Sequence, residues 1–175
     1  LTEIPEPEFE VVVFDNRGPS FRPPVGDFEL PEALSTQTAE GQTAGKCEVI
    51  CFAPDHGKSL KDLAPSQVRV ILEAWKDRVR ELSQESFIAH IAPFENRGEE
   101  VGVTLTHPHG QIYSYPFLPP RVEKMLAAAQ EHKDRTGRVL LDDVVAREIK
   151  DGERIIARND HWIAFVPYAA RYPFE

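Results

Sequence analysis

The sequence predicts an α+β fold, in which helices flank a mostly antiparallel sheet. Short segments rich in β-branched and aromatic residues surround three segments with helical periodicity, and the two kinds do not alternate regularly along the chain. The chain has 175 residues, of which 41% are hydrophobic, so it is long enough to bury one sizeable core. We therefore expect a single domain over residues 1–175.

The expected strands are short segments with apolar alternation or β-branched runs, bounded by turn residues. They cover residues 9–14, 47–53, 87–94, 103–106, 111–115, 154–157 and 161–166. The last two segments are separated by three polar residues, so we expect them to pair as a hairpin.

The clearest helix is expected over residues 65–84, where apolar residues recur every three or four positions and a proline suits the first turn. Two further helices are expected over residues 119–131 and 140–150, the second ending at an Asp-Gly pair. Residues 15–45 carry several prolines and glycines without a clear period, and we interpret them as a long loop.

Composition narrows the classes of function. The formal net charge is −9, which argues against non-specific binding to nucleic acid, because such binding needs a basic face. No apolar run approaches the roughly 20 residues that span a bilayer, and no basic-then-apolar leader opens the chain, so we expect a cytoplasmic protein and no membrane partner. Cys47 and Cys51 would share one face of a strand, which is more typical of two small buried residues than of a disulfide or a metal-binding pair.

The most informative motif is His107-Pro108-His109-Gly110-Gln111. Pro108 favours an extended backbone, in which the side chains of His107, His109 and Gln111 point to one face. Gly110 has no side chain, so we expect it to let a ligand approach the backbone closely. A neutral imidazole with one unprotonated nitrogen is a competent nucleophile, and an amide can donate to a phosphoryl oxygen. The motif therefore fits covalent catalysis on a phosphate, although a His-x-His pair alone is more typical of metal ligands or of a surface pair.

The whole string at residues 107–112, His-Pro-His-Gly-Gln-Ile, resembles the active-site strand of the galactose-1-phosphate uridylyltransferase family, in the histidine-triad superfamily. Four further segments resemble that family in the same order. They are Val-Phe-Asp-Asn-Arg at 13–17, Cys-Phe-Ala-Pro-Asp-His at 51–56, Phe-Glu-Asn-Arg-Gly at 94–98, and the final passage at 161–175. The resemblance covers most of the chain from residue 9 onward.

The resemblance implies a double displacement that moves UMP from UDP-glucose to galactose 1-phosphate. His109 would attack the α-phosphorus of UDP-glucose and carry the uridylyl group until galactose 1-phosphate accepts it. The main-chain carbonyl of His107 would hold the ring of His109 in the reactive tautomer. Gln111 and Asn96 would bind phosphoryl oxygens, and Asn16 would lie near the nucleoside.

Three more substrate-binding positions are implied by the resemblance. Arg17 lies in the segment that resembles the family's uridine-binding turn. Arg97 takes a position often held by lysine, where a cation would face an anionic substrate, although an exposed arginine without that role is equally compatible. Thr104 takes the place of a serine that contacts phosphate. The surrounding residues 103–106, Val-Thr-Leu-Thr, depart from the commoner Cys-Ser-Asn-Pro and indicate a divergent branch.

His56 and His107 match two ligands of the family's zinc site, so we expect their imidazoles to approach each other. The family's other two ligands form a Cys-x-x-Cys pair, which this sequence lacks, because Cys47 and Cys51 have a different spacing. Two protein ligands rarely hold zinc. Zinc is therefore one expectation, and a hydrogen-bonded His56 without metal is the other.

The resemblance also implies that the natural protein has further residues before this chain and a second half after it, and that it forms a homodimer. Two other functions stay open. The chain could belong to a different histidine-triad nucleotidyltransferase or phosphorylase, acting on ADP-sugars or dinucleotides. It could also be a nucleotide-binding fragment that does not catalyse a reaction.

Overall fold

The computed structural model describes residues 8–24, 44–98, 103 and 107–172. The chain divides into two compact units, residues 1–119 and 120–175. Each unit combines helices with antiparallel strands, so the α+β prediction is confirmed. The expectation of a single domain over residues 1–175 stays a prediction.

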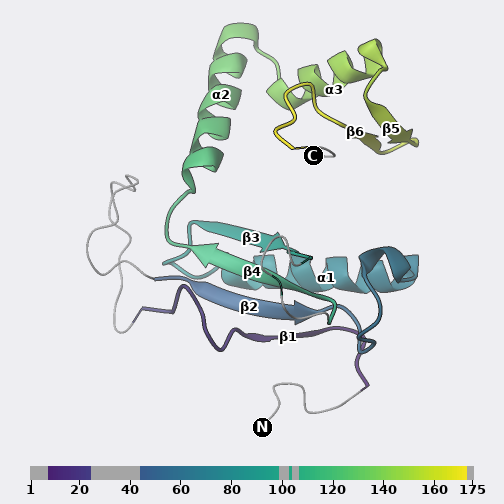
Figure 1. Ribbon diagram of the computed structural model, residues 1–175. Helices are drawn as coiled ribbons and strands as arrows, with labels where there is room; N and C mark the ends of the chain where they lie inside the picture. Colours follow the sequence, from purple (N-terminus) through teal and green to yellow (C-terminus); the bar gives the residue numbers. More distant parts are fainter. Residues whose placement is uncertain (1–7, 25–43, 99–102, 104–106, 173–175) are drawn as a thin grey trace. The chain divides into compact units, whose positions relative to one another are not determined.

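The first unit contains a four-stranded sheet, drawn in Figure 1. Its strands are β1 (Val12–Asp15), β2 (Lys46–Cys51), β3 (His90–Phe94) and β4 (His109–Tyr115). They lie in the order β1-β2-β4-β3, and every neighbouring pair is antiparallel. The motif residues His109 to Gln111 thus open an inner strand that is paired on both sides, and their backbone is extended as the sequence predicts.

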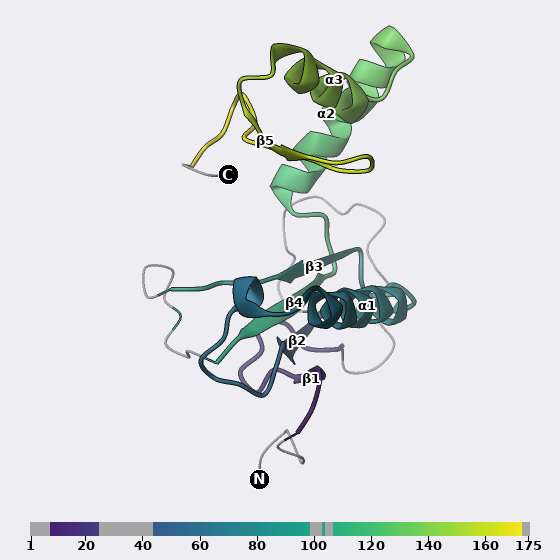
Figure 2. The ribbon, with the colours of Figure 1, turned by 90° about the vertical axis from the view of Figure 1, so that its right-hand side faces the viewer.

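One face of this sheet is covered by helix α1 (Pro65–Leu82), as Figures 1 and 2 show from two directions. A short 3-10 helix η1 (Leu60–Asp62), which the sequence pattern did not reveal, precedes it. The core joins Ile50 and Phe52, from β2 and the residue after it, to Ile71 of α1. Helix α1 begins at the proline that the sequence indicates and ends two residues before the predicted end.

Strand β4 has two different faces, because side chains alternate along a strand. Gly110, Ile112 and Ser114 are buried on the side of the core. His109 and Gln111 are half-buried on the opposite face. The alternation therefore brings the two motif side chains out on the face that α1 does not cover.

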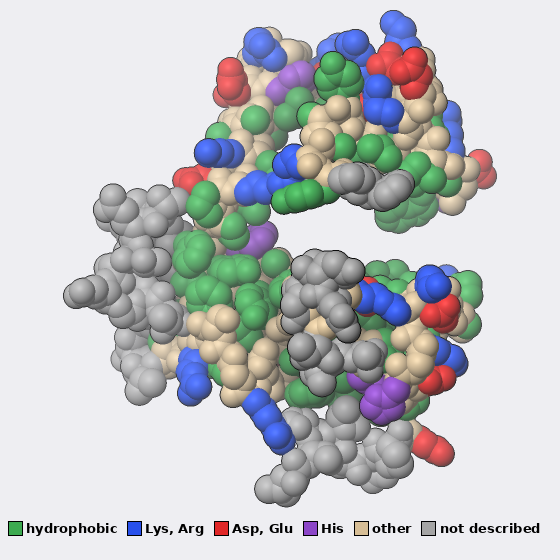
Figure 3. Space-filling model, viewed as in Figure 1, with side chains coloured by type: hydrophobic (Ala, Val, Ile, Leu, Met, Phe, Trp, Pro, Cys, Tyr) green, Lys and Arg blue, Asp and Glu red, His purple; other side chains and the backbone are tan. Residues whose placement is uncertain are grey.

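That open face changes from polar to aromatic along β4. Phe21 packs edge-on against Tyr113 and Tyr115, with ring centroids 6.3 and 5.1 Å apart. Figure 3 shows hydrophobic side chains gathered where β4 ends. His109 and Gln111 occupy the beginning of the strand, so the polar motif and the aromatic cluster share one face.

A buried ion pair ties the sheet to α1. Glu48 of β2 is 3% exposed. Its carboxylate accepts hydrogen bonds from Nε of Arg78 at 2.9 Å and from Nη2 at 2.8 Å, and Nζ of Lys46 lies 3.1 Å away. A buried carboxylate is tolerated only when it is paired in this way, so these contacts help to set where α1 crosses β2.

The second unit consists of α2 (Pro120–Thr136), α3 (Leu140–Asp151) and a hairpin of β5 (Ile155–Arg158) and β6 (Ile163–Phe165). Gly152 ends α3 with a left-handed φ of 73°, in agreement with the Asp-Gly signal. The two helices are joined by a contact of 2.7 Å between His132 and Asp143, and this hydrogen bond lowers the pKa of Asp143.

Some boundaries differ from the sequence-based expectations. Strand β1 begins at Val12 rather than at residue 9, because pairing with β2 extends only from Val12 to Asp15. The segment interpreted as a loop at 15–45 contains a bridge between Arg22 and Ala44. The extended segment expected at 103–106 lies outside the described residues, apart from Val103.

Candidate active site

The ring of His109 is held by the main chain just before it. Nδ1 of His109 lies 2.8 Å from the carbonyl oxygen of His107. A carbonyl oxygen can only accept a hydrogen bond, so Nδ1 carries the proton. In a neutral ring the other nitrogen, Nε2, then keeps its lone pair. The geometry therefore produces the tautomer that a nucleophilic imidazole needs.

Pro108 helps to fix this local geometry. Its carbonyl oxygen accepts a hydrogen bond of 3.0 Å from the main-chain N–H of Phe52, directly after β2. The register of the strands places Cys51 opposite His109. The turn at His107 and the start of β4 are thus attached to β2, which limits how far the His109 ring can move.

The side chain of Gln111 is held by a residue that directly follows the edge strand β1. Gln111 follows His109 on the same face, and its Oε1 accepts a hydrogen bond of 3.2 Å from Nδ2 of Asn16. Asn16 follows β1, and its main-chain N–H donates to the carbonyl of Cys47 at 2.9 Å. Two residues separated by 95 positions therefore meet on the open face.

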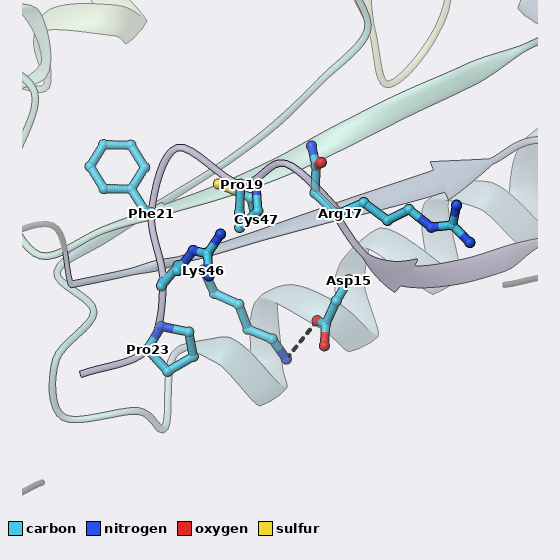
Figure 4. Close-up of a pocket in the computed structure, with 9 residues that line it drawn as sticks. Asp15, Arg17, Pro19, Phe21, Pro23, Lys46 and Cys47 are labelled. Atoms are coloured by element: carbon cyan, nitrogen blue, oxygen red, sulfur yellow. Dashed lines mark ion pairs between the residues drawn. The ribbon is translucent and has the colours of Figure 1, made fainter. Parts of the chain in front are cut away.

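A hollow of about 380 Å³ lies beside Asn16. Figure 4 shows its lining, in which Arg17 and Lys46 are basic and Phe21 is aromatic. Lys46 is not isolated there, because its Nζ lies 3.5 Å from a carboxylate oxygen of Asp15. Arg17 thus contributes to the wall of a partly cationic hollow next to the candidate site.

The three other expected substrate-binding residues belong to the stretch of sequence between β3 and β4. Asn96 and Arg97 are exposed in the segment after β3. Arg97 is one of the charges that lower the pKa of Asp62, after the larger effect of the hydrogen bond from Ser59. Thr104 lies outside the described residues. The roles expected for these three residues stay predictions.

His56 and His107 meet, as the sequence predicts. Their Nδ1 atoms are 3.0 Å apart, and their ring centroids are 4.4 Å apart. Burial, followed by the nearby His56 and His109 rings, lowers the pKa of His107. His107 lies in a bend before β4, and its ring contacts that of His56.

The pair fits half of a tetrahedral zinc site. Two nitrogens bound to one zinc at about 2.0–2.1 Å are about 3.3 Å apart in tetrahedral geometry, which is close to the observed 3.0 Å. Among the described residues, however, no group of three or more His, Cys, Asp or Glu side chains could hold a metal ion. Cys47 and Cys51 are both buried and free, as expected for small core residues.

Gly110 is needed for core packing and not for the ligand approach that the sequence predicts. It was expected to admit a ligand, but it lies on the buried face of β4. A Cβ added there would be 2.8 Å from Cζ of Phe52 and 2.8 Å from the carbonyl oxygen of Phe94. Core packing therefore requires a glycine at this position, and the sequence motif alone did not indicate this.

Sequence reasoning also missed how Asn16 is oriented. Its Oδ1 accepts a hydrogen bond of 2.9 Å from the main-chain N–H of Gly18. An asparagine followed two residues later by glycine is a known signal for such a side-chain turn, and it could have predicted this contact. The meeting of Asn16 with Gln111 has no comparable local signal.

An antiparallel sheet that carries His-Pro-His-Gly-Gln at the start of an inner strand, with the second histidine held by the carbonyl of the first, defines a protein of the histidine-triad class. The comparisons specify the family. Residues 9–119 match the model of the galactose-1-phosphate uridyl transferase N-terminal domain. The chain belongs to this family.

Individual relatives agree with that assignment. The chain is 45% identical over 170 residues to the galactose-1-phosphate uridylyltransferase of Streptomyces lividans, covering 97% of this chain and 43% of the relative. It is 38% identical over 181 residues to that of Thermotoga maritima, covering 99% and 53%. The chain thus spans about half the length of the curated relatives it matches.

Two solved structures superpose on most of the chain. One described as the structure of uridylyltransferase superposes with a TM-score of 0.79 and 34% identity, covering 94% of this chain and 52% of that one. An ADP-glucose phosphorylase from Arabidopsis thaliana with bound ADP-glucose gives a TM-score of 0.74 and 26% identity, covering 96% and 50%.

In the part of the chain that the structure describes, no helix is long and apolar enough to cross a membrane.

Replacing Gly110 by alanine is expected to lower the free energy of unfolding by about 1–3 kcal/mol, the usual range for overpacking. The added Cβ would crowd Phe52 and the backbone of Phe94. Chemical denaturation of the full-length protein measures the change. Gly18→Ala is the matched control, since nothing lies within 4 Å of its added Cβ. Equal stability of the two variants would contradict the packing role of Gly110.

Proposed function

We propose that the full-length protein transfers UMP from UDP-glucose to galactose 1-phosphate through a uridylyl group carried on His109. The observation that carries the proposal is the 2.8 Å contact between Nδ1 of His109 and the carbonyl of His107, which leaves Nε2 unprotonated. The names of the relatives support the choice of substrates.

In the first displacement, the lone pair of Nε2 of His109 attacks the α-phosphorus of UDP-glucose. The bond between that phosphorus and the bridging oxygen breaks, and glucose 1-phosphate leaves with the electron pair. The ring becomes positively charged while its Nδ1–H still points at the carbonyl of His107. That carbonyl dipole stabilises the charge, and the amide of Gln111 donates a hydrogen bond to a phosphoryl oxygen.

In the second displacement, a phosphate oxygen of galactose 1-phosphate attacks the same phosphorus. The phosphorus–nitrogen bond breaks, its electron pair returns to Nε2, and UDP-galactose leaves. The protein is then in its starting state. Two displacements with one nucleophile split a difficult transfer into two steps with lower barriers.

A second candidate is phosphorolysis of an ADP-sugar, in which inorganic phosphate replaces galactose 1-phosphate as the acceptor. It is favoured by one observation, the superposition on the ADP-glucose phosphorylase with bound ADP-glucose. The first displacement would use the same His109 and Gln111. Incubating the full-length protein with labelled UDP-glucose and with labelled ADP-glucose separates the candidates by which nucleotide is retained on histidine.

We also propose that His56 and His107 are two ligands of a structural zinc ion, with the other ligands outside the described residues. The spacing of their Nδ1 atoms supports this. No step of the transfer is assigned to the metal. Zinc analysis of the purified full-length protein should find bound metal that is reduced in His56→Ala, and equal zinc in the two proteins would contradict the assignment.

A cytoplasmic homodimer is part of the same proposal. The free cysteines Cys47 and Cys51 are compatible with a reducing compartment. The dimer rests on the family resemblance alone, and light scattering that gives a monomer would contradict it.

Replacing His109 by glycine is expected to abolish transfer from UDP-glucose to galactose 1-phosphate in the full-length protein. Gln111 is not nucleophilic, and the ring of His107 is turned to His56. Free imidazole should enter the space left by the ring and take its place. The expected product is detached uridylyl-imidazole, because the groups that stabilise the phosphoryl oxygens remain.

The matched control is His107→Gly, which keeps His109 and should show no such rescue by imidazole. Chromatography of the nucleotide products distinguishes the two variants. Near-normal turnover by His109→Gly, or rescue of His107→Gly instead, would show that the nucleophile is wrongly assigned.

A further inference from the structure

The side chain of Gln111 has two ends with opposite electrostatic character. The Nε2 group donates hydrogen bonds, whereas Oε1 only accepts them. A phosphoryl oxygen gains negative charge during the displacement, so Nε2 stabilises it and Oε1 would repel it. A rotation of half a turn about the last side-chain bond exchanges the two ends. The structure must therefore select one orientation if Gln111 is to assist the reaction.

Asn16 makes that selection. Its Nδ2 donates to Oε1 of Gln111 at 3.2 Å, which occupies the accepting end and directs Nε2 away from Asn16. Asn16 is subject to the same ambiguity, since its own amide could also be reversed. It is resolved by Gly18, whose main-chain N–H lies 2.9 Å from Oδ1 of Asn16. A main-chain N–H can only donate, so the direction of the whole chain of hydrogen bonds is fixed at Gly18.

Backbone hydrogen bonds hold this relay, the chain of hydrogen bonds from Gly18 through Asn16 to Gln111, in place. The main-chain N–H of Asn16 donates to the carbonyl of Cys47, so the turn after β1 is attached to β2. Strand β2 lies between β1 and β4 in the sheet, and Val49 of β2 pairs with both Phe14 and Gln111. The side chain of Asn16 thus reaches across a whole strand to meet Gln111 on the open face.

We infer that Asn16 is a positioning residue, which acts through Gln111 by fixing the orientation of its amide toward the reacting phosphate. The inference rests on the proposed function of His109. It assigns Asn16 a role distinct from a direct contact with the nucleoside. A direct contact would act on binding and independently of Gln111, whereas positioning requires Gln111 to be present.

The test is a double-mutant cycle in the full-length protein, measured as the single-turnover rate of uridylylation by saturating UDP-glucose. Asn16→Ala removes the hydrogen bonds of the side chain without adding charge, and is expected to slow uridylylation about 10-fold, a part of the about 10²-fold expected for loss of a phosphoryl-oxygen donor. In a Gln111→Met background, the same change is expected to slow it less than about 2-fold, because nothing remains to be oriented.

A second variant tests the polarity of the relay. Asn16→Asp can accept but not donate, so Gln111 would turn Nε2 toward it and present Oε1 to the phosphate. It is expected to be slower than Asn16→Ala. Glu73→Ala, at an exposed position of helix α1 on the other side of the sheet, is the control and should retain the normal rate. Circular dichroism and thermal unfolding confirm that each variant is folded.

Two results would overturn the positioning role of Asn16, and a third would refute the proposed function instead. Equal fold losses for Asn16→Ala with and without Gln111 would overturn the inference and indicate direct binding by Asn16. A wild-type rate in Asn16→Ala would overturn it as well. Failure of the wild-type protein to label His109 with any nucleotide sugar would instead refute the proposed function, so the two failures are distinguishable.

Discussion

The close packing of Phe52 against Gly110 is the constraint on which the candidate site depends. The ring of Phe52 occupies the space that any side chain at position 110 would need. The same ring packs edge-on against Trp75 of α1, with centroids 5.8 Å apart. The buried face of β4 is thereby held against the core, and alternation along the strand places His109 and Gln111 on the opposite face. The position of β4 against the core therefore determines both the core packing and the geometry of the candidate site.

Main-chain groups then determine the polarity of the site. The carbonyl of His107 can only accept, so it selects the protonated Nδ1 of His109. The N–H of Gly18 can only donate, so it selects the orientation of Asn16 and through it that of Gln111. The unprotonated nitrogen of His109 and the donating end of the Gln111 amide are thus both specified by backbone atoms. Such atoms need no reorganisation as charge develops on a phosphate, which is the condition for efficient electrostatic stabilisation.

The parts of the fold and of the candidate site that could be predicted from the sequence are those that depend on local patterns and on the motif. Helix α1 follows from its apolar periodicity, and the extended start of β4 follows from Pro108 and the residues after it. The proximity of His56 and His107 followed from the family resemblance, because 51 positions separate them and no local rule joins them. The hydrogen bond between Asn16 and Gln111 depends on the order of three strands, which sequence pattern did not supply. The role of Gly110 was misjudged because its neighbours, Phe52 directly after β2 and Phe94 of β3, do not come from its own strand.

The proposed reactivity of His109 requires a proton on Nδ1 and a lone pair on Nε2. Nuclear magnetic resonance of the full-length protein with isotope-labelled histidine rings reads this directly, because protonated and unprotonated ring nitrogens have distinct shifts. In the neutral ring of His109, we expect a protonated Nδ1 and an unprotonated Nε2. A protonated Nε2 with an unprotonated Nδ1 would contradict it, since the ring could neither donate to the carbonyl of His107 nor attack phosphorus through Nε2.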